Sequence, residues 1–141
     1  MRVVADTNVV ISGLLWRGPS RAVLDAAREG RLELFTSSEL LAELAEVLER
    51  FKFRERLERA GVDASELVAG FASLAVWAAP AERETVVLAD ADDDAVLACA
   101  RAANAEWIVS GDRHLLELSS YRGIEILSPA TAMELLSGHP P

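Results

Sequence analysis

The chain begins Met1-Arg2-Val3-Val4-Ala5-Asp6-Thr7-Asn8-Val9, and this stretch decides its fold. Val3, Val4 and Ala5 form an apolar run without polar alternation, which is typical of a strand buried on both faces in a parallel sheet. The run ends at Asp6. A carboxylate at the carboxyl end of a buried strand lies where open α/β sheets place their ligands. The opening stretch therefore predicts an α/β fold with a ligand-binding edge at Asp6.

The rest of the chain alternates strand and helix patterns. Further strands are expected at 32–36, 76–78, 107–109 and 124–127, with apolar stripes at helical spacing between them. This order predicts a three-layer α/β/α sandwich with a central five-stranded parallel sheet, joined by right-handed crossovers. We expect one domain over 1–137, followed by a disordered tail at 138–141.

Several residues predict where individual helices begin and end. Ser20 is expected to cap the second helix, and Gly30 to stop it. Ser37 or Ser38 is expected to cap the helix after the second strand. Pro129 suits the first turn of the last helix.

Composition limits the classes of function. The chain has 141 residues, 51% of them hydrophobic, and a net charge of -9 from 23 acids and 14 bases. This balance weighs against a protein that coats duplex DNA by charge alone. It still allows nucleic-acid chemistry, because carboxylates that hold divalent cations carry part of the negative charge.

Cysteine content and hydropathy further limit the kind of protein that the sequence can encode. The single Cys99 cannot form an internal disulfide, and a zinc site would need carboxylates besides Cys99, His114 and His139. No apolar run reaches the length of about 18 residues needed to span a membrane. We expect a soluble cytoplasmic protein without a membrane partner.

Four acidic residues fall at or near the ends of predicted elements. Asp6 and Asp112 each follow a predicted buried strand. Glu43 lies in the helix that follows the second strand, and Asp94 opens an apolar helix. Each has an ordinary explanation as well. Asp6 and Asp112 suit turns, Glu43 suits a solvated helix face, and Asp94 suits a helix cap.

The combination is more specific than its members. Strand-end and helix-start acids of a parallel α/β sheet point to one edge. The run Asp90-Ala91-Asp92-Asp93-Asp94 exceeds what capping requires, and its charges repel one another unless a cation is bound. Clustered carboxylates are hard oxygen ligands suited to Mg²⁺ or Mn²⁺. We therefore expect a divalent-metal site.

At these residues the sequence resembles the PIN-domain family, and most of all its VapC-like members, which are toxins of toxin–antitoxin pairs. The resemblance covers nearly the whole chain in order and spacing. Its matching pieces are Val3 to Val9, Ser37 to Leu44, Asp92 to Ala100, Ile108 to Leu116 and Ile126 to Pro129.

The resemblance implies a Mg²⁺- or Mn²⁺-dependent endoribonuclease that cleaves RNA phosphodiesters with a metal-activated water. The family's acidic site carries over to Asp6, Glu43, Asp94 and Asp112 as metal-binding and catalytic residues. Asp93 is the alternative to Asp94 after a one-residue shift, although the spacing Asp-x-x-Leu-Ala favours Asp94. Two supporting polar positions match Asn8 and Ser110.

The resemblance also implies partners: an RNA substrate, a cognate antitoxin and a second copy of the chain in a homodimer. The leucine-rich helices at 38–49 and 65–75 are candidate contact surfaces, although core packing accounts equally well for the same leucines. Arg17, Arg21 and Arg113 are candidates for RNA contact.

A second basic group interleaves with acids and fits an ordinary charged helix face better; it comprises Arg50, Lys52, Arg54, Arg56 and Arg59. Two other classes of function remain open. One is a PIN-like binding module without catalysis. The other is a receiver-like, Mg²⁺-dependent phosphoacceptor, which would need an Asp after the third strand and a Lys near the last one.

Overall fold

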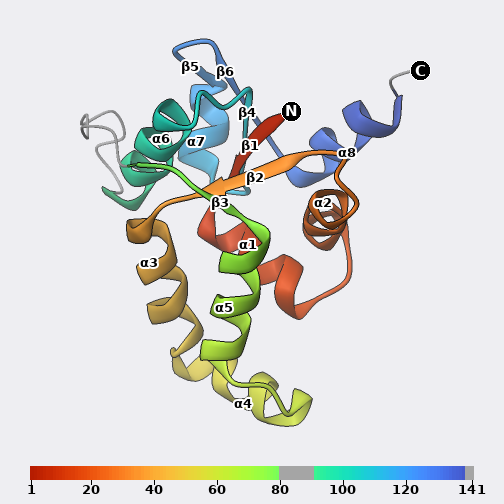
Figure 1. Cartoon of the computed structure of the whole chain (residues 1–141), viewed down its shortest axis with the longest axis vertical. Coiled ribbons are helices and arrows are strands. Elements are labelled where there is room, and N and C mark those ends of the chain that lie inside the picture. Colours follow the sequence, from red (N-terminus) through yellow and green to blue (C-terminus); the bar gives the residue numbers. More distant parts are fainter. Residues whose placement is uncertain (80–90, 139–141) are drawn as a thin grey trace.

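The fold is a three-layer α/β/α sandwich, seen in a computed structural model that describes residues 1–79 and 91–138 (Figure 1). Its sheet has six strands in the order β3-β2-β1-β4-β6-β5, and all neighbours are parallel except β5 and β6. The strands are β1 (Arg2–Ala5), β2 (Glu33–Thr36), β3 (Val76–Trp77), β4 (Trp107–Val109), β5 (Ser120–Tyr121) and β6 (Ile124–Leu127).

Eight helices in the described residues connect and cover these strands. They are α1 (Thr7–Leu15), α2 (Pro19–Arg28), α3 (Ser38–Leu48), α4 (Phe51–Ala60), α5 (Ala64–Leu74), α6 (Ala91–Ala102), α7 (Arg113–Leu118) and α8 (Pro129–Gly138). In Figure 1, α6 and α7 lie on one side of the sheet, while α1, α2, α5 and α8 lie on the other.

Alternating side chains of the central strands build a separate core on each face of the sheet. Val3 and Ala5 of β1 pack in the cluster that includes residues of α1, α2, α3 and α5. Val4, between them, packs instead with Ile108 of β4 and the apolar residues of α6. Val3 and Val4 have no exposed surface, so the predicted strand with two buried faces is confirmed.

Most of the predicted element ends agree with the structure. Ser37 caps α3 by accepting a hydrogen bond from the Leu40 N–H at 3.3 Å. The expected five parallel strands and the three layers are confirmed. The leucines of α3 lie mainly in the core, which supports the packing explanation given for them above.

Three expectations need correction. Ser20 does not cap α2, because the helix begins at Pro19 after an N-cap at Gly18, and proline suits the first turn. Asp94 does not open α6, which begins at Ala91 and places Asp94 one turn inside. The sequence also gave no sign of β5, a two-residue strand that forms an antiparallel hairpin with β6.

Two further expectations concern the end of the chain and the acidic run. The helix α8 extends through Gly138, one residue beyond the expected end of the domain. The rest of the expected tail, 139–141, lies outside the described residues, as does Asp90 of the acidic run. Within the described ranges, no helix is long and apolar enough to cross a lipid bilayer.

Gly13 fixes how closely α1 and α2 pack. A Cβ atom at this position would lie 2.7 Å from Leu24 Cδ1 and 2.8 Å from the backbone oxygen of Ser20. Carbon atoms do not approach a backbone oxygen that closely, so any larger residue must push the two helices apart. Gly70 in α5 is the opposite case, since a Cβ there would meet nothing within 4 Å.

We expect Gly13→Ala to destabilise the fold by about 1–3 kcal/mol through overpacking. Gly70→Ala should instead stabilise it by up to about 1 kcal/mol, because alanine favours a helix interior. Thermal unfolding of both variants tests the packing. A Gly13→Ala protein that melts at or above the wild-type temperature would contradict it.

Candidate metal site

Asp6 lies at the end of β1 and begins α1. Its N–H donates to the Val109 carbonyl at 2.9 Å, and its own carbonyl accepts from the N–H groups of Val9 and Val10. The backbone of Asp6 therefore does the work of an N-cap, but its side chain makes no capping hydrogen bond. The carboxylate is 5% exposed. A turn or cap does not account for this side chain.

The Ser110 hydroxyl connects Asp6 with Asp112. Ser110 Oγ donates to Asp6 Oδ2 at 2.8 Å and accepts from the Asp112 N–H at 2.9 Å. Ser110 has no exposed surface, and its own N–H donates to the Leu127 carbonyl at 2.9 Å. One buried hydroxyl thus fixes the ends of β1 and β4 to each other. The expected supporting role of Ser110 has a direct structural basis in this contact.

Asp112 acts as the N-cap of α7. Its Oδ1 accepts hydrogen bonds from the His114 N–H at 2.7 Å and the Leu115 N–H at 3.2 Å. The capping explanation for Asp112 is therefore correct as far as Oδ1 is concerned. It does not exclude metal binding, because a carboxylate has further lone pairs available.

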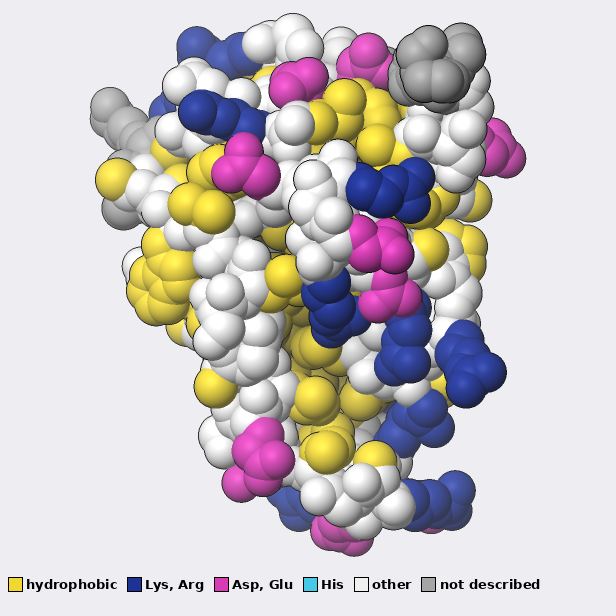
Figure 2. Space-filling model, turned by 45° about the vertical axis from the view of Figure 1, so that its right-hand side comes forward, with side chains coloured by type: hydrophobic (Ala, Val, Ile, Leu, Met, Phe, Trp, Pro, Cys, Tyr) yellow, Lys and Arg dark blue, Asp and Glu magenta, His cyan; other side chains and the backbone are white. Residues whose placement is uncertain are grey.

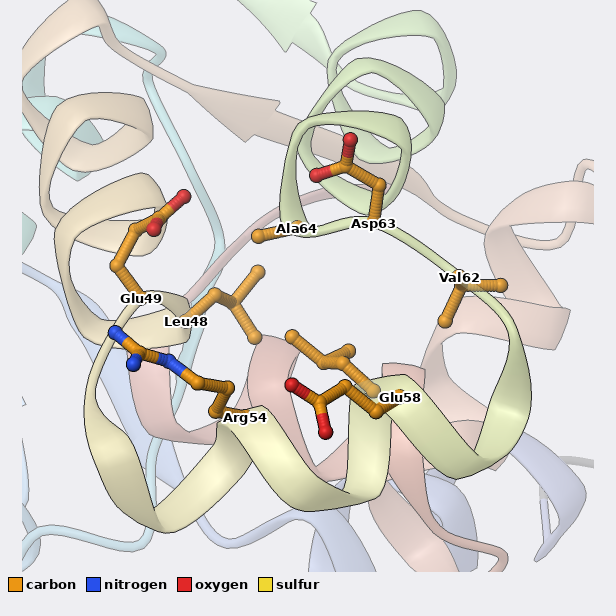
Figure 3. A pocket seen from close by; sticks show the side chains of 8 residues that line it. Leu48, Glu49, Arg54, Glu58, Val62, Asp63 and Ala64 are labelled. Atoms are coloured by element: carbon orange, nitrogen blue, oxygen red, sulfur yellow. The ribbon is translucent and has the colours of Figure 1, made fainter.

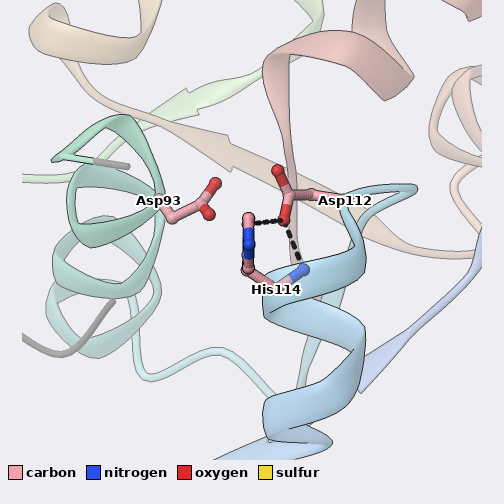
Figure 4. A group of neighbouring side chains, drawn as sticks. All are labelled: Asp93, Asp112 and His114. Carbon is pink, nitrogen blue, oxygen red and sulfur yellow. Dashed lines mark hydrogen bonds and ion pairs between the residues drawn. The ribbon is translucent and has the colours of Figure 1, made fainter. Parts of the chain in front are cut away.

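Asp93, Asp112 and His114 come together at this edge, as Figure 4 shows. One possible ligand atom from each residue lies within 4.8 Å of those of the other two. His114 Nδ1 is 3.6 Å from Asp112 Oδ1. Asp93 is 3% exposed and projects from the first turn of α6 toward the loop that carries Asp112.

Three other predicted residues, Asp94, Glu43 and Asn8, are not members of this cluster. Asp94 is 7% exposed, next to Asp93 on α6, and is not one of the three clustered residues. Glu43 is half-buried on α3, one turn after Leu40, which packs in the core cluster containing α6. Asn8 is exposed on α1.

Sequence reasoning missed His114 and ranked Asp93 second. The sequence did contain a local signal for His114. It stands two residues after Asp112, so it lies in the first turn of the helix that Asp112 caps. The choice of Asp94 over Asp93 rested on the spacing Asp-x-x-Leu-Ala. In the structure it is Asp93, in the first turn of α6, that projects toward Asp112.

Cys99 is buried and is not one of the clustered residues. It lies in α6 with 2% of its surface exposed, and burial raises the pKa of its thiol from 9.0 to about 11, although a hydrogen bond with the Ser37 side chain acts in the opposite direction. The thiol is therefore protonated at neutral pH and is a poor nucleophile or ligand. Its contact with Ser37 instead joins α6 to the start of α3.

A pocket elsewhere on the molecule contains none of the predicted site residues. It has a volume of about 170 Å³ and lies between the end of α3, α4 and the start of α5 (Figure 3). Its walls are formed by Leu48, Glu49, Arg54, Leu57, Glu58, Val62, Asp63 and Ala64. The mixture of acids with one arginine there offers no convergent metal ligands.

The donor set at the acidic edge fits a divalent cation. Asp6, Asp93 and Asp94 are each less than 10% exposed. Burying several carboxylates near one another is costly unless cations, protons or hydrogen bonds compensate their charge. Carboxylate oxygens suit Mg²⁺ and Mn²⁺, and His114 adds a nitrogen donor of the kind that Mg²⁺ accepts less readily.

The comparison with known families agrees with the fold. A family profile described as a PIN domain matches residues 2–114, which include Asp6, Glu43, Asp94 and Asp112. The chain therefore belongs to the PIN-domain family. Proteins with this domain are generally metal-dependent nucleases, and the acidic residues of this chain can hold a metal. No curated protein sequence matches the chain.

We expect Ser110→Ala to destabilise the protein by about 1–3 kcal/mol, because it removes the shared partner of the buried Asp6 Oδ2 and the partly buried Asp112 N–H. Ser110→Thr keeps the hydroxyl and should lose less. Urea unfolding of the two variants measures the difference. Equal stability of Ser110→Ala and the wild type would show that the hydroxyl does not hold this edge together.

Mn²⁺ should raise the melting temperature of the wild-type protein, since a ligand that binds only the folded state stabilises it. The shift should be lost in Asp6→Asn and in whichever of Asp93→Asn and Asp94→Asn removes a ligand. Each variant is compared with its own melt in EDTA, so a fold defect is not mistaken for lost binding.

Asp25→Asn is the matched control for the melts, because Asp25 is an exposed residue of α2 that pairs with Arg28. It should keep the full Mn²⁺ shift. If the wild type shows no shift at millimolar Mn²⁺, the proposed site does not bind this ion.

Proposed function

We propose that this chain is a Mg²⁺- or Mn²⁺-dependent endoribonuclease that acts as the toxin of a type II toxin–antitoxin system. The observation that carries the proposal is the chain of contacts from Asp6 through the Ser110 hydroxyl to Asp112, with Asp93 and His114 beside it. Membership of the PIN-domain family supports the nuclease chemistry. The resemblance to VapC-like toxins supports the finer assignment.

Asp6, Asp112 and one of Asp93 and Asp94 are proposed to hold the cation, and Glu43 to assist from α3. A divalent cation there supplies Lewis-acid polarisation of the scissile phosphate and lowers the pKa of a water molecule. Ser110 keeps the Asp6 carboxylate oriented. The backbone N–H groups of α7 hold the Asp112 carboxylate in place. The expected products carry a 5′-phosphate and a 3′-hydroxyl.

Three partners follow from this proposal. RNA is the substrate, an antitoxin binds the toxin and covers its site, and a second copy of the chain completes a homodimer. The structure contains shallow apolar space between α3 and α5, about 280 Å³ lined by Ala45, Val68, Ala69 and neighbouring residues. This space is one candidate surface for a protein partner.

A catalytically inactive PIN-like binding module is the alternative, because the presence of the acids establishes competence and not activity. It would bind RNA or a protein partner, with or without the metal, and cleave nothing. The receiver-like alternative loses its support, since the chain belongs to the PIN-domain family.

We expect the wild-type protein to cleave RNA in Mn²⁺ and to stop in EDTA. Asp6→Asn and Asp112→Asn should each lower the rate by at least about 100-fold, because each removes an oxygen ligand of the cation. Rates are measured on a labelled single-stranded RNA. Mapping of the fragment ends tests for a 5′-phosphate.

The control is again Asp25→Asn, which should keep the wild-type rate. Cleavage that continues in EDTA and in both substituted proteins would contradict the metal-dependent mechanism. Binding of Mn²⁺ without any cleavage, over a range of single-stranded RNA sequences, would favour the inactive module.

A further inference from the structure

The structure joins two basic groups that are far apart in sequence. Arg56 of α4 donates hydrogen bonds from Nε, at 3.0 Å, and from Nη2 to the carbonyl of Leu15 at the end of α1. Its guanidinium carbon also lies 4.9 Å from the ring centroid of Trp16. Arg56 thereby fixes α4 against the end of α1, where the exposed Arg17 follows Trp16 in the chain.

Two aromatic rings at this junction each have a cationic side chain beside them. The rings of Trp16 and Phe53 are 6.3 Å apart and tilted by 59°. Lys52 Nζ lies 5.0 Å from the centroid of the Phe53 ring. We call Trp16, Arg17, Lys52, Phe53 and Arg56 the aromatic–basic platform.

Core packing does not account for Trp16, because 43% of its surface is exposed. An indole held in place by a cation and a neighbouring ring is an ordered surface on which another flat group can stack. Trp16 is thus available to a ligand without first being immobilised.

The charge around the platform is positive although the whole chain carries -9. Residues 50–60 include five basic residues against two acidic ones. Among the described residues, Arg59 pairs with Glu55, whereas Arg17, Lys52 and Arg56 form no ion pair with a carboxylate. In Figure 2, Lys and Arg side chains gather in the lower right part of the face, where α4 lies below the end of α1.

We propose that the aromatic–basic platform binds single-stranded RNA, with a base stacked on Trp16 and phosphates neutralised by Arg17 and Lys52. Stacking on an aromatic ring beside fixed cations is the usual chemistry of single-strand recognition, and it tolerates different sequences. The proposal rests on the endoribonuclease function and assigns its substrate-binding surface. It favours unpaired RNA over duplex RNA, whose bases are already stacked on each other.

The spacing between platform and acidic edge suits such a substrate. Asp6 and Trp16 flank opposite ends of α1, so ten residues of helical rise separate them by about 15 Å. At about 3.4 Å per stacked nucleotide, this separation equals four to five nucleotides. A rigid helix therefore sets the distance between the bound base and the cleavage site.

An acidic protein segment is the rival occupant of a basic surface. It needs the cations but gains little from the ordered indole, whereas a nucleobase uses both. The dependence of binding on Trp16 consequently separates the two occupants.

The test is binding of a fluorescein-labelled oligoadenylate, followed by fluorescence anisotropy in EDTA at low salt, where cleavage is stopped. Trp16→Ala should weaken binding by about 10-fold or more, the loss expected for one stacked base, while Trp16→Phe should keep most of the affinity. Lys52→Ala should make the logarithmic dependence of affinity on salt shallower by about 0.7.

Two matched controls accompany these variants. Trp77→Ala removes another exposed tryptophan, from β3, and Arg28→Ala removes an exposed arginine of α2 that pairs with Asp25. Both should bind the oligonucleotide as the wild type does. Melting curves of every variant confirm that the fold is kept.

Equal affinities of Trp16→Ala and Trp77→Ala would overturn the proposal, as would a wild type that binds a polyglutamate peptide through the platform but not the oligonucleotide. Trp16-dependent binding supports the platform even if Mn²⁺ then yields no cleavage. In that case the proposed nuclease function is rejected, whereas the proposed RNA-binding role of the platform is retained.

Discussion

One buried hydroxyl group holds the proposed active edge together. Ser110 Oγ is hydrogen-bonded both to the Asp6 carboxylate and to the Asp112 backbone, so the ends of β1 and β4 cannot move independently. The sheet makes this contact possible, because β1 and β4 are parallel neighbours in register from Val3–Trp107 to Ala5–Val109. Asp6 and Asp112, which follow β1 and β4, therefore lie at the same edge of the sheet. A bound cation would compensate the negative charge that these carboxylates concentrate there.

The fold followed from sequence wherever burial on two faces left a clear pattern. Val3, Val4 and Ala5, and likewise Trp107 to Val109, have no polar alternation, and both runs are central strands. Short edge elements were harder to foresee. The strand β5 has only two residues and no apolar run, and its pairing with β6 depends on a turn with positive φ at Arg122 and Gly123. Ser20 was misread because Pro19 supplies the helix start more directly.

The sequence predicted part of the acidic edge that the structure brings together. Acids at strand ends pointed to Asp6 and Asp112, which Ser110 connects, whereas the position of Asp93 beside Asp112 depends on the rotation of α6, which sequence spacing does not fix. His114 belongs to the cluster because it lies in the first turn of the short helix α7. The contact of Trp16 with Arg56 was beyond sequence reasoning, because the two residues are 40 positions apart, with α2, β2 and α3 between them. The alternation of acids and bases in α4 gave no indication that Lys52 and Arg56 lie beside aromatic rings.

The most direct measurement is a crystal structure of the wild-type protein grown with Mn²⁺, with the ion located by its anomalous scattering. The account predicts a peak at the edge formed by Asp6, Asp112 and the first turn of α6, with carboxylate oxygens at about 2.1 Å. The same map shows whether Asp93 or Asp94 is the ligand. A fully ordered edge without a peak, or an ion bound only elsewhere, would contradict the account.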